Sequence, residues 1–203
     1  MKKMKILTLL VVTVLITIIL SCSTTGNDNG NNEENILPYE VGNQWQYIRC
    51  EKNETKIDTI VLIQYISGKE TINYNNEELD LYKWVWYLPI DTLEMTINIY
   101  PINDGIMACS QDYITHNILF KYPVSVGDEW TCNWDGTGTC KCHSTNTTIQ
   151  TPVGDFDCII YGFYGSDNNL FMEMYVCKGV GIVYIYNYDS DYEIYLKSYT
   201  IVD

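Results

Sequence analysis

The sequence predicts an all-β protein of about a dozen short strands, built as an antiparallel sandwich or as a strongly curved half-barrel sheet with two related halves. Three observations support this fold class. Apolar and polar residues alternate with a period of two, most clearly over residues 92–99. Turn-forming residues interrupt this alternation at regular intervals. No amphipathic helix of useful length follows residue 21.

Residues 1–21 predict an export signal. Lys2, Lys3 and Lys5 precede an apolar run over residues 6–20, the order of charge and hydrophobicity typical of such signals. The run is short for a membrane span, which needs about 20 residues. A plain secretory signal and an uncleaved anchor are the alternatives to the lipoprotein signal described next.

The stretch Ile19-Leu20-Ser21-Cys22 resembles the lipobox of bacterial lipoproteins. The resemblance implies that Cys22 bears a thioether-linked diacylglycerol, that the preceding peptide is removed, and that the new amino terminus is acylated, for example with palmitate. It also implies a lipid-anchored position in the cell envelope. Ser23 follows the cysteine in place of the aspartate that retains some lipoproteins at the inner membrane, so the outer membrane is expected in a host that has one.

Residues 22–35 are expected to be the lipid-bearing cysteine and a flexible tether, because residues 23–35 are polar with nothing apolar to bury. Residues 36–203 form the expected single domain. Nine of the twelve basic residues and all 26 acidic residues follow residue 21, which gives this part of the chain a net charge of −17. Such acidity excludes nucleic acid as a partner, because its binding needs Lys or Arg to displace counterions. We expect the protein to associate with the membrane through the lipid on Cys22.

Residues 38–45 and 123–130 share the pattern Pro-x-x-Val-Gly-[Asn/Asp]-[Gln/Glu]-Trp, and residues 152–156 are a weaker copy. Proline favours extended backbone, Gly-Asn or Gly-Asp makes a tight turn, and tryptophan anchors the following strand. We expect these segments to be turns that lead into strands rather than binding loops. Strands are expected at 55–66, 79–88, 92–99, 145–151, 156–164, 170–177, 182–188 and 192–202, and one helical turn would fit within 112–119.

The first of these patterns, the strand that ends at Cys158 and the Lys-Gly-Val-Gly-Ile-Val segment at 178–183 together resemble a set that recurs in uncharacterised bacterial lipoproteins. Some of those proteins are similar in architecture to the Lol-type lipoprotein carriers, in which a curved antiparallel sheet holds an apolar groove. This resemblance covers most of the chain from Leu37 onward. It implies a fold and no particular activity.

Seven cysteines remain if Cys22 is lipidated: Cys50, Cys109, Cys132, Cys140, Cys142, Cys158 and Cys177. Export to an oxidising compartment favours disulfides, and an odd number leaves at least one thiol over. Cys132, Cys140, Cys142 and His143 have the donors that zinc prefers. However, Cys-x-Cys is not a standard zinc spacing, and in a strand it places His143 on the face opposite the thiols. We expect a disulfide from Cys132 to Cys140 or Cys142, with no metal and no cofactor.

No catalytic residue is assigned, and an enzyme is the less favoured interpretation. His116 and His143 are the only histidines, and the chain has neither a Gly-x-Ser-x-Gly elbow nor a His-Glu-x-x-His helix. Carboxylates could pair across strands as glycosidases require. The candidates are Glu77, Glu78, Asp80, Asp155, Asp157 and Glu173.

Aromatic strands supply the candidate ligand-binding residues, which are Tyr184, Tyr186 and Tyr188 on one strand and Trp84 and Trp86 on another. An exposed aromatic row can stack on sugar rings or apolar ligands, whereas a buried row reflects strand propensity. The sequence therefore favours a lipid-anchored, non-enzymatic binding or structural module. Its expected partner is a polysaccharide, an apolar ligand or an envelope protein. The alternatives are a carrier with an apolar cavity and an envelope hydrolase that uses a carboxylate pair.

Overall fold

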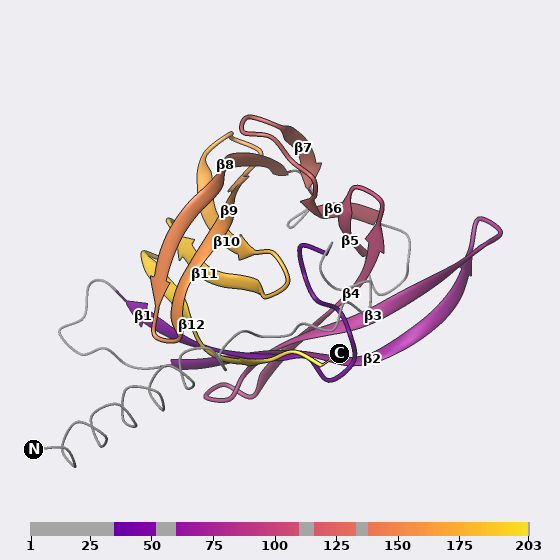
Figure 1. Cartoon of the computed structure of the whole chain (residues 1–203), viewed down its shortest axis with the longest axis horizontal. Helices are drawn as coiled ribbons and strands as arrows, with labels where there is room; N and C mark the ends of the chain where they lie inside the picture. Colours follow the sequence, from indigo (N-terminus) through magenta and orange to yellow (C-terminus); the bar gives the residue numbers. More distant parts are fainter. Residues whose placement is uncertain (1–34, 52–59, 110–115, 133–137, 203) are drawn as a thin grey trace, which may run out of the picture. The chain divides into compact units, whose positions relative to one another are not determined.

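The computed structural model describes residues 35–51, 60–109, 116–132 and 138–202 (Figure 1). The predicted lipidation site Cys22, the signal and the tether lie outside this part of the chain. The described residues form twelve strands and no helix, so the all-β prediction is confirmed and no element has the length and apolar character of a membrane-spanning helix. The strands are β1 (Gln44–Glu51), β2 (Ile60–Tyr74), β3 (Glu77–Leu88), β4 (Leu93–Ile102), β5 (Gly105–Cys109), β6 (His116–Lys121), β7 (Glu129–Cys132), β8 (Gly138–Thr151), β9 (Gly154–Tyr164), β10 (Leu170–Cys177), β11 (Gly181–Asn187) and β12 (Tyr192–Thr200).

All twelve strands belong to one antiparallel sheet with the order β6-β5-β4-β3-β2-β1-β12-β11-β10-β9-β8-β7. Two six-stranded meanders, β1–β6 and β7–β12, are joined where β1 pairs with β12. The sheet curls until its edge strands β6 and β7 approach each other (Figure 1). Trp130 Nε1 donates to the Ile118 carbonyl at 3.1 Å, and the Tyr161 hydroxyl donates to the Lys121 carbonyl at 2.8 Å. Of the two predicted architectures, the curved sheet is therefore the observed one, nearly closed like a barrel.

The two Pro-x-x-Val-Gly segments make the same kind of turn at the start of each meander. Gly42 has a φ of 103° and Gly127 a φ of 90°, a conformation in which glycine carries no steric cost. The tryptophan that follows each turn is the second residue of its strand, and Trp45 Nε1 donates to the Val180 carbonyl at 2.6 Å. The segments are thus turns that lead into strands, as the sequence predicts.

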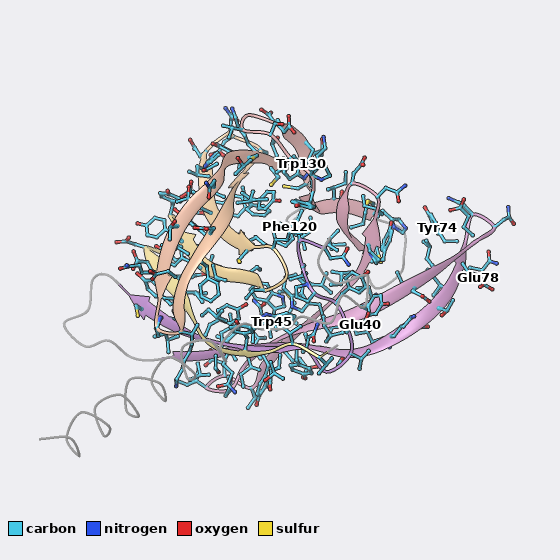
Figure 2. The ribbon with its side chains drawn as sticks, viewed as in Figure 1. Glu40, Trp45, Tyr74, Glu78, Phe120 and Trp130 are labelled. Atoms are coloured by element: carbon cyan, nitrogen blue, oxygen red, sulfur yellow. The ribbon has the colours of Figure 1, made fainter. Side chains whose placement is uncertain are left out.

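The concave side of the sheet is filled by large side chains. Figure 2 shows Trp45 and Phe120 pointing into the space that the sheet encloses. Of the two candidate ligand-binding tryptophans, Trp84 is completely buried in the core, and Trp86, with its ring centroid 5.1 Å away, is partly buried against that core. Burial of one such side chain stabilises the fold by roughly 1.5–3 kcal/mol. The interior is therefore the main source of stability.

Candidate functional site

Six tyrosines gather on the outer face of strands β9–β12. Along β10, Met172, Met174 and Val176 are buried in the core, so the residues between them point outward. The ladder with β11 places Met174 opposite Ile185 and Tyr175 opposite Tyr184, which extends the same division to β11. We call this outer surface the tyrosine face; its tyrosines are Tyr164, Tyr175, Tyr184, Tyr186, Tyr188 and Tyr195. The sequence-based candidates Tyr184, Tyr186 and Tyr188 thus share one face.

Three of these tyrosines form a row that crosses three strands. Tyr184 lies opposite Tyr175 on one side and opposite Tyr195 on the other. The ring centroids are 4.8 Å and 4.9 Å apart, with interplanar angles of 76° and 47°. Aromatic pairs with such tilted geometry contribute about 0.5–1.5 kcal/mol beyond their buried area. Tyr175 was missed from the sequence, although its place in the period-two pattern of residues 170–177 puts it on the same face as Glu173.

Carboxylates lie directly beside this row. The next cross-strand row consists of Glu173, Tyr186 and Glu193, which lie opposite one another in the ladders. Three phenols donate hydrogen bonds to carboxylates: Tyr188 to Glu173 Oε2 at 2.9 Å, Tyr195 to Glu193 Oε2 at 2.5 Å and Tyr186 to Asp191 Oδ1 at 3.0 Å. Burial, reinforced by the hydrogen-bonded glutamate, raises the pKa of Tyr188 and of Tyr195 to about 12. Tyr188 and Tyr195 therefore remain neutral donors at physiological pH.

His143 completes the site from strand β8. Its ring lies on the outer face, where Nδ1 is 2.6 Å from Glu173 Oε1 and Nε2 is 2.8 Å from Tyr164 Oη. The ladder between β8 and β9 has a register shift at this residue, between Cys142 and Ser144. The ring passes over Gly162, which lies opposite Glu173 and has no side chain to obstruct it. This link could not be predicted from the sequence, because 30 residues separate the histidine from the glutamate.

The Cys-x-Cys pair lies on the other side of β8. Cys140 and Cys142 are fully buried, whereas His143 faces outward, as the strand parity predicts. Among the described side chains, no three His, Cys, Asp or Glu residues are grouped as a metal ion would require. The Cys132 and Cys140 thiols interact with each other, and no disulfide joins the cysteines that the structure describes. The predicted disulfide at Cys132 therefore stays a prediction.

The remaining sequence-based candidates are distributed over other parts of the sheet. Asp80 on β3 forms an ion pair with Lys69 at 2.8 Å, and Asp157 on β9 accepts a hydrogen bond from Thr148 at 2.7 Å. The six carboxylates named from the sequence are spread over β3, β9 and β10 rather than gathered, and Glu173 is the one that joins the tyrosine face. His116 lies elsewhere in the sheet, where its Nδ1 is hydrogen-bonded to the Tyr100 hydroxyl oxygen at 2.9 Å and the two rings are in edge-to-face contact.

A pocket of about 520 Å³ lies apart from the tyrosine face, between the segment at residues 35–36 and the turn from β4 to β5. Ile36, Ile102 and Ile106 line its apolar side. Lys178 also lines it, with Nζ 5.6 Å from the centroid of the Tyr122 ring. Its volume is in the range of small-molecule sites.

Comparison with known proteins gives one structural likeness. No protein-family model matches the chain, and no curated protein matches it in sequence. A crystal structure described as "a putative lipoprotein from Parabacteroides distasonis ATCC 8503" is similar to this chain with a TM-score of 0.47 and 15% sequence identity. The similarity covers 84% of this chain and 100% of that one. A likeness of this strength does not establish a shared function.

Proposed function

We propose that this protein is a lipid-anchored module of the cell envelope that binds a neutral polysaccharide on its tyrosine face. The observation that carries the proposal is the row of Tyr175, Tyr184 and Tyr195, which runs beside the carboxylates of Glu173 and Glu193. Tyr184 at its centre is only 8% exposed, so the half-buried rings of Tyr175 and Tyr195 and the exposed ring of Tyr188 are the ones that can meet a ligand. Aromatic rings stack on the C–H faces of sugars. Carboxylates accept hydrogen bonds from sugar hydroxyls, and phenol oxygens can both donate and accept.

The form and charge of the surface narrow the ligand class. The tyrosine row and the neighbouring row of Glu173, Tyr186 and Glu193 both cross strands that lie about 4.8 Å apart. Together they form an open strip rather than an enclosed pocket. Such a strip can accommodate a chain of sugar rings. Tyr188 is 43% exposed at one end of this strip. The part of the chain after residue 21 carries a net charge of −17. Anionic polymers are repelled by such a surface, which leaves neutral polysaccharides as the favoured class.

The lipid anchor in this proposal rests on the lipobox-like stretch that ends at Cys22. The polar tether after it would hold the sheet away from the bilayer. In a host with an outer membrane, the proposed location is that membrane. A module anchored in this way would keep the tyrosine face within reach of envelope or surface polysaccharides.

Affinity electrophoresis of the full chain in detergent tests the binding function. Gels would contain a neutral glucan, mannan, galactan or xylan, with polygalacturonate as the anionic comparison. We expect at least one neutral polymer to retard the protein, and Tyr188→Ala and Glu193→Gln to reduce that retardation several-fold. Tyr199→Ala is a matched control, because Tyr199 has the same 43% exposure but lies outside the tyrosine face, opposite Trp45.

Two results would contradict the proposal. One is normal migration of the wild-type protein in every neutral polymer. The other is retardation that survives Tyr188→Ala and Glu193→Gln but is lost in Tyr199→Ala, which would place binding on a different surface.

A further inference from the structure

Two cysteines meet in the hairpin formed by β9 and β10. The ladder pairs Ile160 with Tyr175 and Ile159 with Val176, so the next step places Cys158 opposite Cys177. Residues two apart on a strand share a face. Cys158 therefore lies on the same side of β9 as Ile160, and Cys177 lies on the same side of β10 as Tyr175. Both cysteines therefore lie on the same side of the sheet as the tyrosine row, with Cys158 buried and Cys177 partly exposed.

The backbone geometry of this pair suits a disulfide. Directly opposed residues in an antiparallel ladder have Cα atoms about 4.5–5.5 Å apart. Native disulfides span Cα separations of about 4.4–6.8 Å, so a bond requires side-chain rotation but no movement of the strands. The Cys158 thiol now donates to the Phe156 carbonyl at 3.4 Å and the Cys177 thiol to the Lys178 carbonyl at 3.7 Å. Both are weak contacts that rotation can release.

The other described cysteines on the ladders do not have this arrangement. Cys50 lies opposite Glu193, and Cys109 lies opposite Asn98 and His116. Cys142 lies opposite Tyr161 on the concave side. Burial, and to a lesser degree the neighbouring Cys177, raise the pKa of Cys158 to about 12.

We propose that Cys158 and Cys177 form a disulfide that cross-links β9 to β10 at the border of the tyrosine face, made by exchange with the disulfide of an oxidised thiol–disulfide oxidoreductase or of oxidised glutathione. This modification site is independent of polysaccharide binding. The export signal supports it, because an exported chain meets such oxidants.

The exchange occurs in two balanced steps. Cys177 is partly exposed and Cys158 is buried, so the Cys177 thiolate attacks the oxidant first. One new S–S bond joins Cys177 to the oxidant, and one oxidant sulfur leaves as a thiol. The Cys158 thiolate then attacks the Cys177 sulfur and releases the second oxidant sulfur as a thiol. The protein loses two hydrogen atoms, and the oxidant disulfide is reduced to two thiols.

Peptide mapping of the full chain, exported into an oxidising compartment and extracted in detergent, tests this proposal. Thiols are blocked with N-ethylmaleimide in denaturant without reduction, and the protein is then digested for mass spectrometry. We expect a peptide pair joined through Cys158 and Cys177, about 2 Da lighter than the sum of its reduced parts. Cys158→Ser and Cys177→Ser should each abolish it, whereas Cys50→Ser should leave it intact.

A second sample, reduced and then exposed to oxidised glutathione while folded, guards against loss of the bond during extraction. Maleimide on both Cys158 and Cys177 in both samples would overturn the proposal. A link from either residue to a different cysteine would overturn it as well. Both readings come from the wild-type chain, so poor folding of a variant cannot hide them.

Discussion

The imidazole of His143 occupies the space that a side chain at Gly162 would need. A Cβ added at residue 162 would lie 3.1 Å from His143 Nδ1 and closer still to Cε1 and Nε2 of the same ring. Gly162 lies on β9, between the strand that carries His143 and the strand that carries Glu173. The absence of a side chain at this one position therefore lets the histidine reach across a whole strand to the glutamate, and so connects the site.

Gly162→Ala should therefore destabilise the protein, by about 1–3 kcal/mol as in other overpacked sites. Urea unfolding measures the loss. Gly68→Ala is the matched control, because Gly68 is also a strand glycine and a Cβ there meets nothing within 4 Å. Combining Gly162→Ala with His143→Ala should cost less than the sum of the two single changes, because the second removes the ring that the first displaces. Strict additivity would show that the ring contact carries no energy.

The seam at which β6 meets β7 and β9 should depend on Tyr161 of β9. This side chain is fully buried, and its hydroxyl donates to the Lys121 carbonyl at 2.8 Å. Tyr161→Phe keeps the ring and leaves that carbonyl without this donor, which should lower the free energy of unfolding by about 1–3 kcal/mol. Trp130→Phe removes the other seam bond and should cost a comparable amount. Unchanged urea midpoints for both variants would mean that the seam is closed by other contacts.

Stability should fall in alkaline solution as tyrosines ionise. The pKa of Tyr188 and Tyr195 is raised from the ordinary 10.0 to about 12, first by burial and then by Glu173 and Glu193 respectively. Above pH 10 the unfolded chain therefore loses these protons before the folded one does, and the stabilisation is lost progressively between pH 10 and about 12. Urea midpoints measured across this interval should decline less steeply in the Tyr188→Phe, Tyr195→Phe double variant. An equal decline would assign the effect to other groups.

Cys22→Ser should release the protein from membranes if the lipobox-like stretch is used. Serine offers no thiol for the lipid, so the signal would also stay uncleaved by the lipoprotein-specific peptidase. Fractionation and the mass of the amino-terminal peptide measure both effects. Cys50→Ser is a suitable control, since it removes one thiol from within β1. Continued membrane attachment of the Cys22→Ser protein with an unmodified, uncleaved signal would favour an uncleaved anchor instead.

Local pattern was sufficient for the fold class and for much of its detail. The strand predicted at 170–177 is β10 itself, and the strand predicted at 156–164 lies within β9. Both follow from alternation and turn residues, which are properties of neighbouring residues. Strand parity also predicted that His143 would face away from Cys140 and Cys142. Parity did not reveal its partner, because that depends on which strands are adjacent.

The sequence by itself determined that this chain forms antiparallel strands, that Tyr184, Tyr186 and Tyr188 share a face, and that the part after residue 21 is strongly acidic. Only the tertiary structure decided that this face is the outer one, that Tyr175 and Tyr195 extend it, and that Glu173 meets His143 there. The physical reason is that side-chain direction follows from a period of two within a strand, whereas cross-strand contact depends on register and on the curl of the whole sheet.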